Sequence, residues 1–399
     1  MRTTFVGAAV LLPEGIRTGL YLTVLNGRIE TLSPALPDNP GEVIRADGLV
    51  LCPGLIDLHV HGGGGHDFMD GTAEAFVKAA QAHLPGGTTT LLPTTVCCSF
   101  DETKRALAAL RNARGLPVPL PHMPGLHLEG PWLNPVQAGA QDPAFITLPN
   151  EEEIAWVLEN AHDIARLSAA PEVAGALEAG RRISACGVLV SIGHSDADLA
   201  TVREAVGHGY THVTHLYSGM SSLKRVRAMR VLGVLESAYL LDELTVEIIA
   251  DGVHLPPELL RLILKCKPHA AISLVTDATM GAGLPEGTVI RLGSREAGRE
   301  AVIEHGVAYV PDRTAFAGSV ATADRCVRTM VQEAGLTLAE AVPMMTANPA
   351  AVLGIGHQKG ALLPGMDADL VLLDGDMNVE AVYVMGRLAA RRGAVVENA

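Results

Sequence analysis

Histidine and carboxylate residues recur at the ends of short apolar runs along this sequence. Residues 53–61 read Pro-Gly-Leu-Ile-Asp-Leu-His-Val-His, so one residue separates His59 from His61. Alternate side chains of a β-strand point to the same side, and imidazole is a favoured ligand of zinc and related metals. The pair predicts a metal site, although two core histidines with hydrogen-bond partners would produce the same local sequence.

Four further apolar runs end in side chains that can bind a metal, namely Glu129, His194, His215 and Asp277. Active sites of βα barrels are built at the C-terminal ends of the strands. We therefore expect one metal centre formed by His59, His61, Glu129, His194, His215 and Asp277. His127 shares the face of Glu129, where we expect a structural role. His212 is out of phase with His215, which predicts the outer face or the start of a strand.

The apolar runs alternate with longer amphipathic stretches, which is typical of the α/β class and of a (β/α)8 TIM-type barrel. We predict strands at 51–61, 88–96, 124–129, 165–170, 187–193, 212–216, 245–250 and 272–277. Helices are expected between them, for example at 73–83, 101–114 and 196–206.

Both ends of the chain alternate in the period of a β-strand. Asn26-Gly27 is a strong hairpin signal, and residues 368–373 and 379–384 near the other end are similarly apolar. We expect residues 1–49 and 357–399 to pair into one small β-sandwich domain, and residues 50–356 to form the barrel.

The composition narrows the class of partner and the compartment. A formal net charge of -14 disfavours nucleic acids and anionic membranes, which are bound through basic surfaces. The six cysteines have no CxxC spacing, which favours reduced thiols and the cytoplasm. A small substrate in a closed pocket is the expected ligand.

Several longer motifs resemble the amidohydrolase superfamily and, within it, the N-acetylglucosamine-6-phosphate deacetylase family. They are residues 53–62 (PGLIDLHVHG), 127–134 (HLEGPWLN), 193–195 (GHS), 250–254 (ADGVH), 275–278 (VTDA) and 346–350 (TANPA). The resemblance implies a core metal site at Glu129, His194 and His215, a second metal at His59 and His61, and Asp277 as catalytic acid and base. One or two divalent ions are implied, with zinc expected and iron or another ion as alternatives.

The resemblance also implies a reaction and an assembly. A cation would activate water for attack on the N-acetyl group of N-acetylglucosamine 6-phosphate, and Asp277 would pass a proton to the departing amine. In relatives an arginine from a neighbouring subunit completes the pocket, which implies a homodimer. The implied substrate contacts are Ala140, Gln141, Ser218, Gly219, Arg227, His254, Phe316, Ala317 and Gly318.

The sequence departs from the family in the segments that contact substrate. Gln141 stands where the family has a histidine thought to polarise the acetyl carbonyl, and glutamine cannot carry charge. The basic group Lys224, Arg225, Arg227 and Arg230 would bind a phosphate or carboxylate, or form a solvated helix face. Gly62 to Gly65 would form a phosphate cradle, or a flexible loop beside the metal, the reading we favour because no Gly-Lys-Ser/Thr sequence follows.

Two other functions are compatible with these departures. The first is hydrolysis of an unphosphorylated or other N-acyl amine. The second is an inactive barrel that serves as a scaffold. Retention of every metal candidate disfavours the scaffold, because inward charges are costly without a metal.

Overall fold

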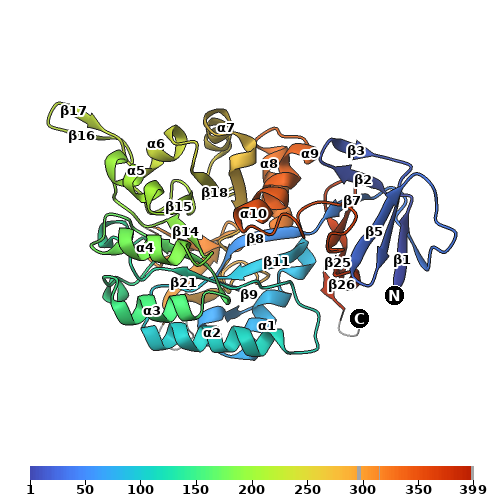
Figure 1. Ribbon diagram of the computed structural model, residues 1–399, viewed down its shortest axis with the longest axis horizontal. Helices are drawn as coiled ribbons and strands as arrows, with labels where there is room; N and C mark the ends of the chain where they lie inside the picture. The colour runs from blue at the N-terminus through green and yellow to red at the C-terminus, as the bar shows by residue number, and fades with distance from the viewer. Residues whose placement is uncertain (294–297, 314, 397–399) are drawn as a thin grey trace.

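Parallel strands form the centre of the computed structural model, which describes residues 1–293, 298–313 and 315–396 (Figure 1). The strands are β8 (Leu55–Val60), β11 (Thr88–Pro93), β12 (Leu126–Glu129), β13 (Ile164–Ala169), β14 (Leu189–Ile192), β15 (Tyr210–Val213), β18 (Thr245–Ile249) and β19 (Ile272–Val275). β8 pairs with β11, and β12 to β19 pair in chain order. Parallel bridges Thr94↔His127 and Val60↔Ala278 join the two sheets into a ring. The predicted TIM-type barrel is confirmed.

Each predicted barrel strand overlaps an observed strand, but the first predicted strand includes residues of two observed strands. Residues 51–61 contain two strands, β7 (Val50–Pro53) and β8, separated by Gly54. A Cβ atom at Gly54 would lie 2.1 Å from Oγ1 of Thr89, so the close approach to β11 requires glycine. β7 pairs with strands outside the barrel, and the prediction of one continuous strand was wrong.

Helices cover the outside of the barrel (Figure 1). They are α1 (Ala73–Gln81), α2 (Phe100–Arg114), α3 (Glu151–Glu159), α4 (Ala176–Ser184), α5 (Leu199–Gly207), α6 (Val234–Leu240), α7 (Pro257–Cys266), α8 (Ala323–Gln332), α9 (Leu338–Ala341) and α10 (Ala347–Val352). Short 3-10 turns lie at Phe68–Asp70, Leu84–Gly86, Pro135–Gln137, Pro143–Phe145, His269–Ala271 and Val342–Met345.

Local sequence explains where several of these helices begin. The Ser99 side chain accepts a hydrogen bond from the backbone of Glu102, whose carboxylate bonds back to Ser99, and this capping box starts α2. The side chains of Thr72 and Asp198 cap α1 and α5 by accepting hydrogen bonds from the backbone N–H groups of Ala75 and Thr201, respectively. The predicted helices 73–83, 101–114 and 196–206 differ from α1, α2 and α5 only near their ends. Among the described residues, no helix combines the length and apolarity needed to cross a membrane.

The two ends of the chain share one β-structure, at the right of Figure 1. One sheet has the order β5-β4-β1-β6 and the other the order β27-β26-β25-β24-β7-β2-β3. Phe5 of β1 and Tyr383 of β25 meet edge to face at 5.0 Å between ring centroids. The other bounds are β1 (Arg2–Val6), β2 (Ala9–Leu12), β3 (Gly15–Arg17), β4 (Tyr21–Leu25), β5 (Arg28–Ser33), β6 (Glu42–Arg45), β24 (Leu370–Leu373), β25 (Val379–Val384), β26 (Arg387–Arg391) and β27 (Ala394–Val395).

An apolar core shared by both sheets includes Phe5, Leu22, Ile29, Leu51 and Leu370. The opposite face of the seven-stranded sheet contributes Leu11, Cys52 and Val382 to the barrel core. The division at residues 49/50 and 356/357 stays a prediction, and β7 lies on its barrel side. The last three residues of the predicted segment 357–399 lie outside the described residues.

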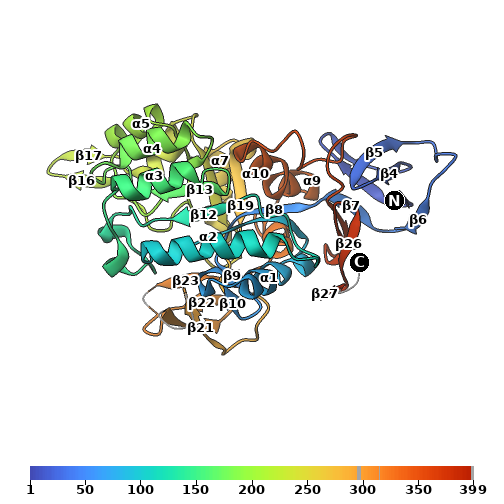
Figure 2. The same ribbon diagram turned by 60° about the horizontal axis from the view of Figure 1, so that its bottom comes forward.

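Two insertions project from the barrel. An antiparallel sheet of β20 (Val289–Leu292), β21 (Arg299–Glu304), β22 (Val307–Tyr309) and β23 (Phe316–Ser319) is seen at the bottom of Figure 2, near the short pair β9 (Gly62–Gly63) and β10 (His66–Asp67). The hairpin β16 (Lys224–Val226) and β17 (Met229–Val231) extends away from the body at the left of both views.

Two leucines of α7 test the contribution of helix packing to stability. Leu260 is fully buried, whereas Leu262 is 47% exposed. Leu260→Ala should lower the free energy of unfolding by about 2–5 kcal/mol, because it leaves a cavity against the barrel. The matched control Leu262→Ala should change it by about 0.5 kcal/mol or less. Equal losses in chemical denaturation would contradict this packing.

Candidate active site

The six predicted site residues lie at the C-terminal mouth of the barrel. His59 and Glu129 belong to β8 and β12, and His61 directly follows β8. His194, His215 and Asp277 follow the ends of β14, β15 and β19 with backbone φ angles of 47°, 28° and 50°. A residue other than glycine rarely adopts positive φ, and such strain concentrates at functional sites. The chain turns sharply after each of these strands and brings the next side chain back over the barrel.

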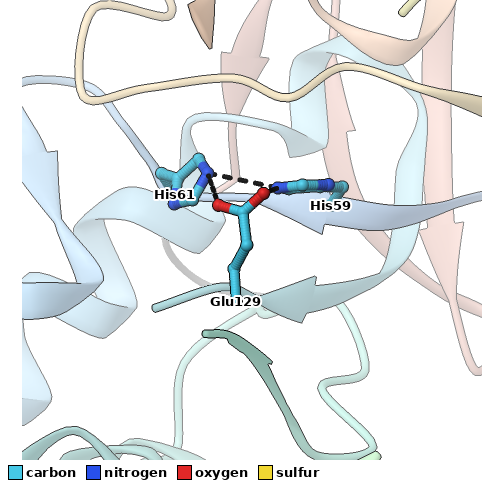
Figure 3. Close-up of side chains that lie close together, drawn as sticks. All are labelled: His59, His61 and Glu129. Atoms are coloured by element: carbon cyan, nitrogen blue, oxygen red, sulfur yellow. Dashed lines mark hydrogen bonds and ion pairs between the residues drawn. The ribbon is translucent and has the colours of Figure 1, made fainter. Parts of the chain in front are cut away.

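The Glu129 carboxylate is the common neighbour of four histidines. Its Oε1 lies 3.1 Å from Nε2 of His194 and 2.9 Å from Nε2 of His215. His59 and His61 lie on either side of the same carboxylate (Figure 3), with their Nε2 atoms 3.5 Å from Oε1 and 3.4 Å from Oε2, respectively. All these side chains are buried.

Two groups of donor atoms, which have Glu129 in common, could each hold a metal ion. The groups are His59, His61 and Glu129, and Glu129, His194 and His215. The Nε2 atoms are 3.2 Å apart in each histidine pair. Ligands about 2.0–2.1 Å from a tetrahedral cation lie about 3.3 Å from one another, so these spacings suit ligation. The nitrogen and oxygen donors also suit zinc and similar divalent ions.

The candidate ligand side chains carry opposite charges when no cation is present, because the pKa shifts favour protonated His59 and His61 and an ionised Glu129. Burial lowers the pKa of His59, but the charges of Glu129 and Asp277 outweigh it and raise that pKa well above its ordinary value. The same competition raises the pKa of His61 to about 9. Burial raises the pKa of Glu129, yet the surrounding histidines hold it well below its usual range. The carboxylates therefore bring negative charge into the site, and either protons on the histidines or bound cations must balance it.

Asp277 faces the His59 and His61 pair. Its Oδ1 lies 3.5 Å from Nε2 of His59 and 3.3 Å from Nε2 of His61. Burial raises the pKa of Asp277, but the charge of His59 and the hydrogen bond with His61 bring the net shift below its ordinary value. The side chain is thus an ionised carboxylate that can accept a proton at neutral pH.

Most of the predicted substrate contacts line one cavity beside these ligands. The cavity has a volume of about 180 Å³. Of the predicted residues, it is lined by Ala140, Gln141, Ser218, Gly219, His254, Phe316 and Gly318, and Gly139, Leu292 and Ala315 add to its wall. Nδ1 of His254 bonds to Asp251 at 2.7 Å, which leaves its other nitrogen available to a ligand.

Two predicted contacts are not in that wall. Ala317 is buried and does not line the cavity, because alternate residues of β23 point away from the mouth. Arg227 lies in the exposed turn of the projecting hairpin and does not line the cavity of its own chain. The basic group also occupies a β-hairpin, so its reading as a helix face was wrong. Lys224 there bonds to Asp196 at 2.6 Å.

Gln141 contacts the Glu129 carboxylate directly. Its Nε2 donates to Oε2 of Glu129 at 2.6 Å, and its Oε1 accepts from the backbone N–H of Cys97 at 2.7 Å. Both ends of the amide are therefore engaged by the protein. The Gln141 side chain therefore holds Glu129 in place. The family resemblance implied a histidine that contacts the substrate at the position of Gln141.

The glycine loop beside the site does not form a phosphate cradle. The backbone N–H groups of Gly62, Gly64 and Gly65 donate to the carbonyls of Ala278, Ala282 and Met280, respectively. These bonds attach the loop to the segment after β19. A phosphate would find no free row of N–H donors on these three glycines.

Several buried polar residues of the site were missed from sequence. Arg166 and Glu247 are fully buried inside the barrel and bond to each other at 2.5 Å. Glu172 accepts hydrogen bonds from Ser195 and Asn134 and so supports the turn that carries His194. A lone charge in an apolar strand was the available signal for Arg166 and Glu247.

Two other histidines are fully buried inside the barrel. His127 bonds to Thr94 and Ser168, which agrees with the structural role expected for it. His212 is buried and lies 3.4 Å from Glu247, so its predicted placement on an outer face was wrong. Pairing between β15 and β18 brings it to Thr245 and the barrel interior.

Gly219 tests how closely the loop after β15 controls a metal ligand. Its φ is +54°, and an added Cβ would lie 2.7 Å from Nδ1 of His194. Gly219→Ala should displace His194 and weaken metal retention by about tenfold or more, as expected when the support of a ligand is disturbed. Metal content after dialysis against a chelator measures this loss.

The matched control is Gly187→Ala. Gly187 also has positive φ, +85°, but a Cβ there would meet nothing within 4 Å. It should share the backbone strain of about 1–2 kcal/mol and keep its metal. Equal retention in both variants would show that the loop does not position His194.

Comparison with known proteins agrees with this arrangement. The sequence model of the amidohydrolase family matches residues 50–389. The N-acetylgalactosamine-6-phosphate deacetylase of Escherichia coli O157:H7 is 32% identical over 382 residues, which is 96% of this chain and 97% of that protein.

Solved structures of two relatives superpose over nearly the whole chain. The N-acetylglucosamine-6-phosphate deacetylase of Pasteurella multocida has a TM-score of 0.90 at 28% identity, covering 98% of this chain and 100% of that one. A Mycobacterium smegmatis enzyme of the same name, in complex with N-acetyl-D-glucosamine-6-phosphate, has a TM-score of 0.87 at 31% identity, covering 97% and 99%. The chain therefore belongs to the amidohydrolase family and, within it, to the N-acetylglucosamine-6-phosphate deacetylase family.

Proposed function

We propose that this protein hydrolyses N-acetylglucosamine 6-phosphate to glucosamine 6-phosphate and acetate. The observation that carries the proposal is the convergence of four histidines, Glu129 and Asp277 on one cavity at the barrel mouth. Relatives that align with nearly the full length of this chain bear names of that activity or of the galactosamine counterpart. The reaction would take place in the cytoplasm, in keeping with thiols that are free among the described residues.

We assign two divalent cations, with zinc as the proposed metal, to the site. His59 and His61 would hold one ion, His194 and His215 the other, and Glu129 would contact both. When bound, the cations supply Lewis-acid activation of water and of the amide carbonyl. The protein keeps the ligands together on rigid strand ends, which limits the reorganisation needed during reaction.

Asp277 is the proposed catalytic acid and base. Its carboxylate is ionised for the reason given above, so it can take a proton from the attacking water. It would then return that proton to the nitrogen of the amino sugar as the carbon–nitrogen bond breaks. His254, fixed by Asp251, lines the same cavity and is the proposed partner of a sugar hydroxyl or carbonyl oxygen.

The Asp277→Asn variant tests this assignment. The amide cannot act as a base, so kcat should fall by about 10²–10⁴-fold, while the other ligands keep the metal content near two ions per chain. Acetate or amine release with N-acetylglucosamine 6-phosphate is the assay. The control Asp198→Asn keeps the cap of α5 and should remain fully active. Near-normal turnover in Asp277→Asn would defeat the mechanism.

A homodimer is the proposed assembly, with the projecting hairpin contacting the second subunit. Its exposed apolar side chains Val226 (53%) and Met229 (70%) are unusual for a solvated turn and suit a protein contact. Arg227, at the turn between them, would reach the partner's cavity and bind the substrate phosphate. An arginine guanidinium matches phosphate oxygens in geometry and charge.

The Arg227→Ala variant separates phosphate binding from the chemistry. Loss of a charge-assisted phosphate contact of about 1.5–3 kcal/mol should raise KM for the phosphorylated sugar about 10–100-fold. Activity on plain N-acetylglucosamine should not change, and Arg387→Ala serves as the control, because Arg387 is an exposed arginine on β26 in the shared β-structure. Assays with the galactosamine epimer identify the preferred sugar.

Light scattering at assay concentration measures the assembly. A fully active monomer, or an unaltered KM in Arg227→Ala, would contradict the role of the hairpin. Faster deacylation of unphosphorylated N-acyl amines than of N-acetylglucosamine 6-phosphate would instead support the alternative substrate class.

A further inference from the structure

The two histidine pairs that face Glu129 have unequal support on their other ring nitrogens. All four point Nε2 toward the carboxylate. A histidine that binds a cation through Nε2 must carry its proton on Nδ1, and a hydrogen-bond acceptor at Nδ1 selects that tautomer. The partners of the four Nδ1 atoms therefore show how strongly the fold prepares each ligand.

Only one of the four has a charged acceptor among the described residues. Nδ1 of His59 lies 2.9 Å from Oε1 of Glu247. Nδ1 of His194 meets the backbone carbonyl of Gln137 at 2.8 Å. The Nδ1 atoms of His61 and His215 are buried and have no hydrogen-bond partner in the part of the chain that the structure describes.

Glu247 is itself fixed from several strands. Its Oε2 accepts from Nη1 of Arg166 at 2.5 Å, and its Oε1 also accepts from the backbone N–H of His215 at 3.0 Å. Arg166 donates further to Ser191 on β14 and to the Thr214 hydroxyl after β15. The carboxylate thus has a defined position, and neither it nor Arg166 is exposed to solvent.

The buried arginine is the counter-ion of this carboxylate. Both side chains are fully buried, and Oε2 of Glu247 lies 2.5 Å from Nη1 of Arg166. A buried ion pair adds little to stability compared with apolar packing. The desolvation cost of burying Arg166 and Glu247 is explained if the pair positions His59, which it contacts.

We propose that Glu247 is the positioning residue for the cation held by His59 and His61, with Arg166 as its counter-ion. Glu247 fixes His59 in the tautomer whose Nε2 lone pair faces Glu129. The position between His59 and His61 consequently depends on a buried charge, whereas the position at His194 and His215 depends on a backbone carbonyl. This inference rests on the proposed two-cation site and adds an inequality between its halves.

The Glu247→Gln variant alters this support at nearly constant volume. If the amide NH2 faces His59, it favours a proton on Nε2 and blocks ligation. If it faces Arg166 instead, two donors oppose each other. Affinity for the Zn²⁺ at His59 and His61 should fall about 10–100-fold. Affinity for the Zn²⁺ at His194 and His215 should fall less, because Glu247 contacts only the backbone N–H of His215 there and Nδ1 of His194 keeps the Gln137 carbonyl.

The experiment is a Zn²⁺ titration of chelator-treated full-length protein against a competing chromophoric chelator. The wild type should bind two ions and Glu247→Gln only one at the free Zn²⁺ level that just fills both wild-type positions. Nitrogen NMR of the imidazoles in the Zn²⁺-loaded protein should show His59 protonated at Nδ1 in the wild type and altered in the variant. A merely structural role would not change this signature.

Asp369→Asn is the matched control for loss of a buried, paired carboxylate. Asp369 is 5% exposed and bonds to Lys359 in the shared β-structure. The control should unfold more easily than the wild type but still bind two ions. One ion lost in both variants would overturn the proposal, because general destabilisation would then explain the loss.

A second variant keeps the test valid if Glu247→Gln fails to fold. Arg166→Met/Glu247→Met removes both charges and the carboxylate acceptor of His59 together, and leaves no unpaired buried ion. It should fold and bind one Zn²⁺ in the same range. A folded variant that retains both ions at wild-type affinity would overturn the role of Glu247, whereas a wild type that binds no Zn²⁺ would contradict the metal site itself.

Discussion

The Glu129 carboxylate is the constraint on which the architecture of the mouth depends. Four imidazole nitrogens lie within 3.5 Å of it, away from bulk water. Lone pairs and charges at such spacing repel one another unless cations or protons lie between them, and their burial is costly. The fold therefore has to hold these side chains in place against the repulsion. Three features do so together: the strand ends, the strained turns after β14, β15 and β19, and the buried ion pair next to His59.

The chemistry of the centre could be predicted from sequence because it depends on residue type and strand phase. His59 and His61 share a face through the two-residue period of a strand, and Glu129 ends a recognisable apolar run. The break at Gly54 was not predictable, since it results from the approach of Thr89 and from pairing with the distant β24. Arg166 and Glu247 were missed for a related reason: a lone charge in an apolar strand gains meaning only when its partner on another strand is known.

The substrate side of the cavity was harder to predict than its metal side. Its wall comes from loops and inserted strands, where backbone conformation follows no simple period. Phe316 and Gly318 reach the cavity from β23, but Ala317 between them does not. The basic group adopts a hairpin because β16 and β17 pair with each other, a choice that the spacing of its arginines did not reveal. The contacts of Gln141 with Glu129 and with the backbone of Cys97 were not evident from its place in the motif.

The pairing of β7 with β24 has a consequence for the order in which the molecule can form. Leu51 of β7 lies opposite Leu372 of β24, so one edge of β7 stays without its neighbour until the C-terminal part of the chain has left the ribosome. An exposed strand edge invites pairing with other chains, and contacts this distant in sequence form slowly. Segments far apart in the chain, on either side of the barrel strands in sequence, thus complete one sheet.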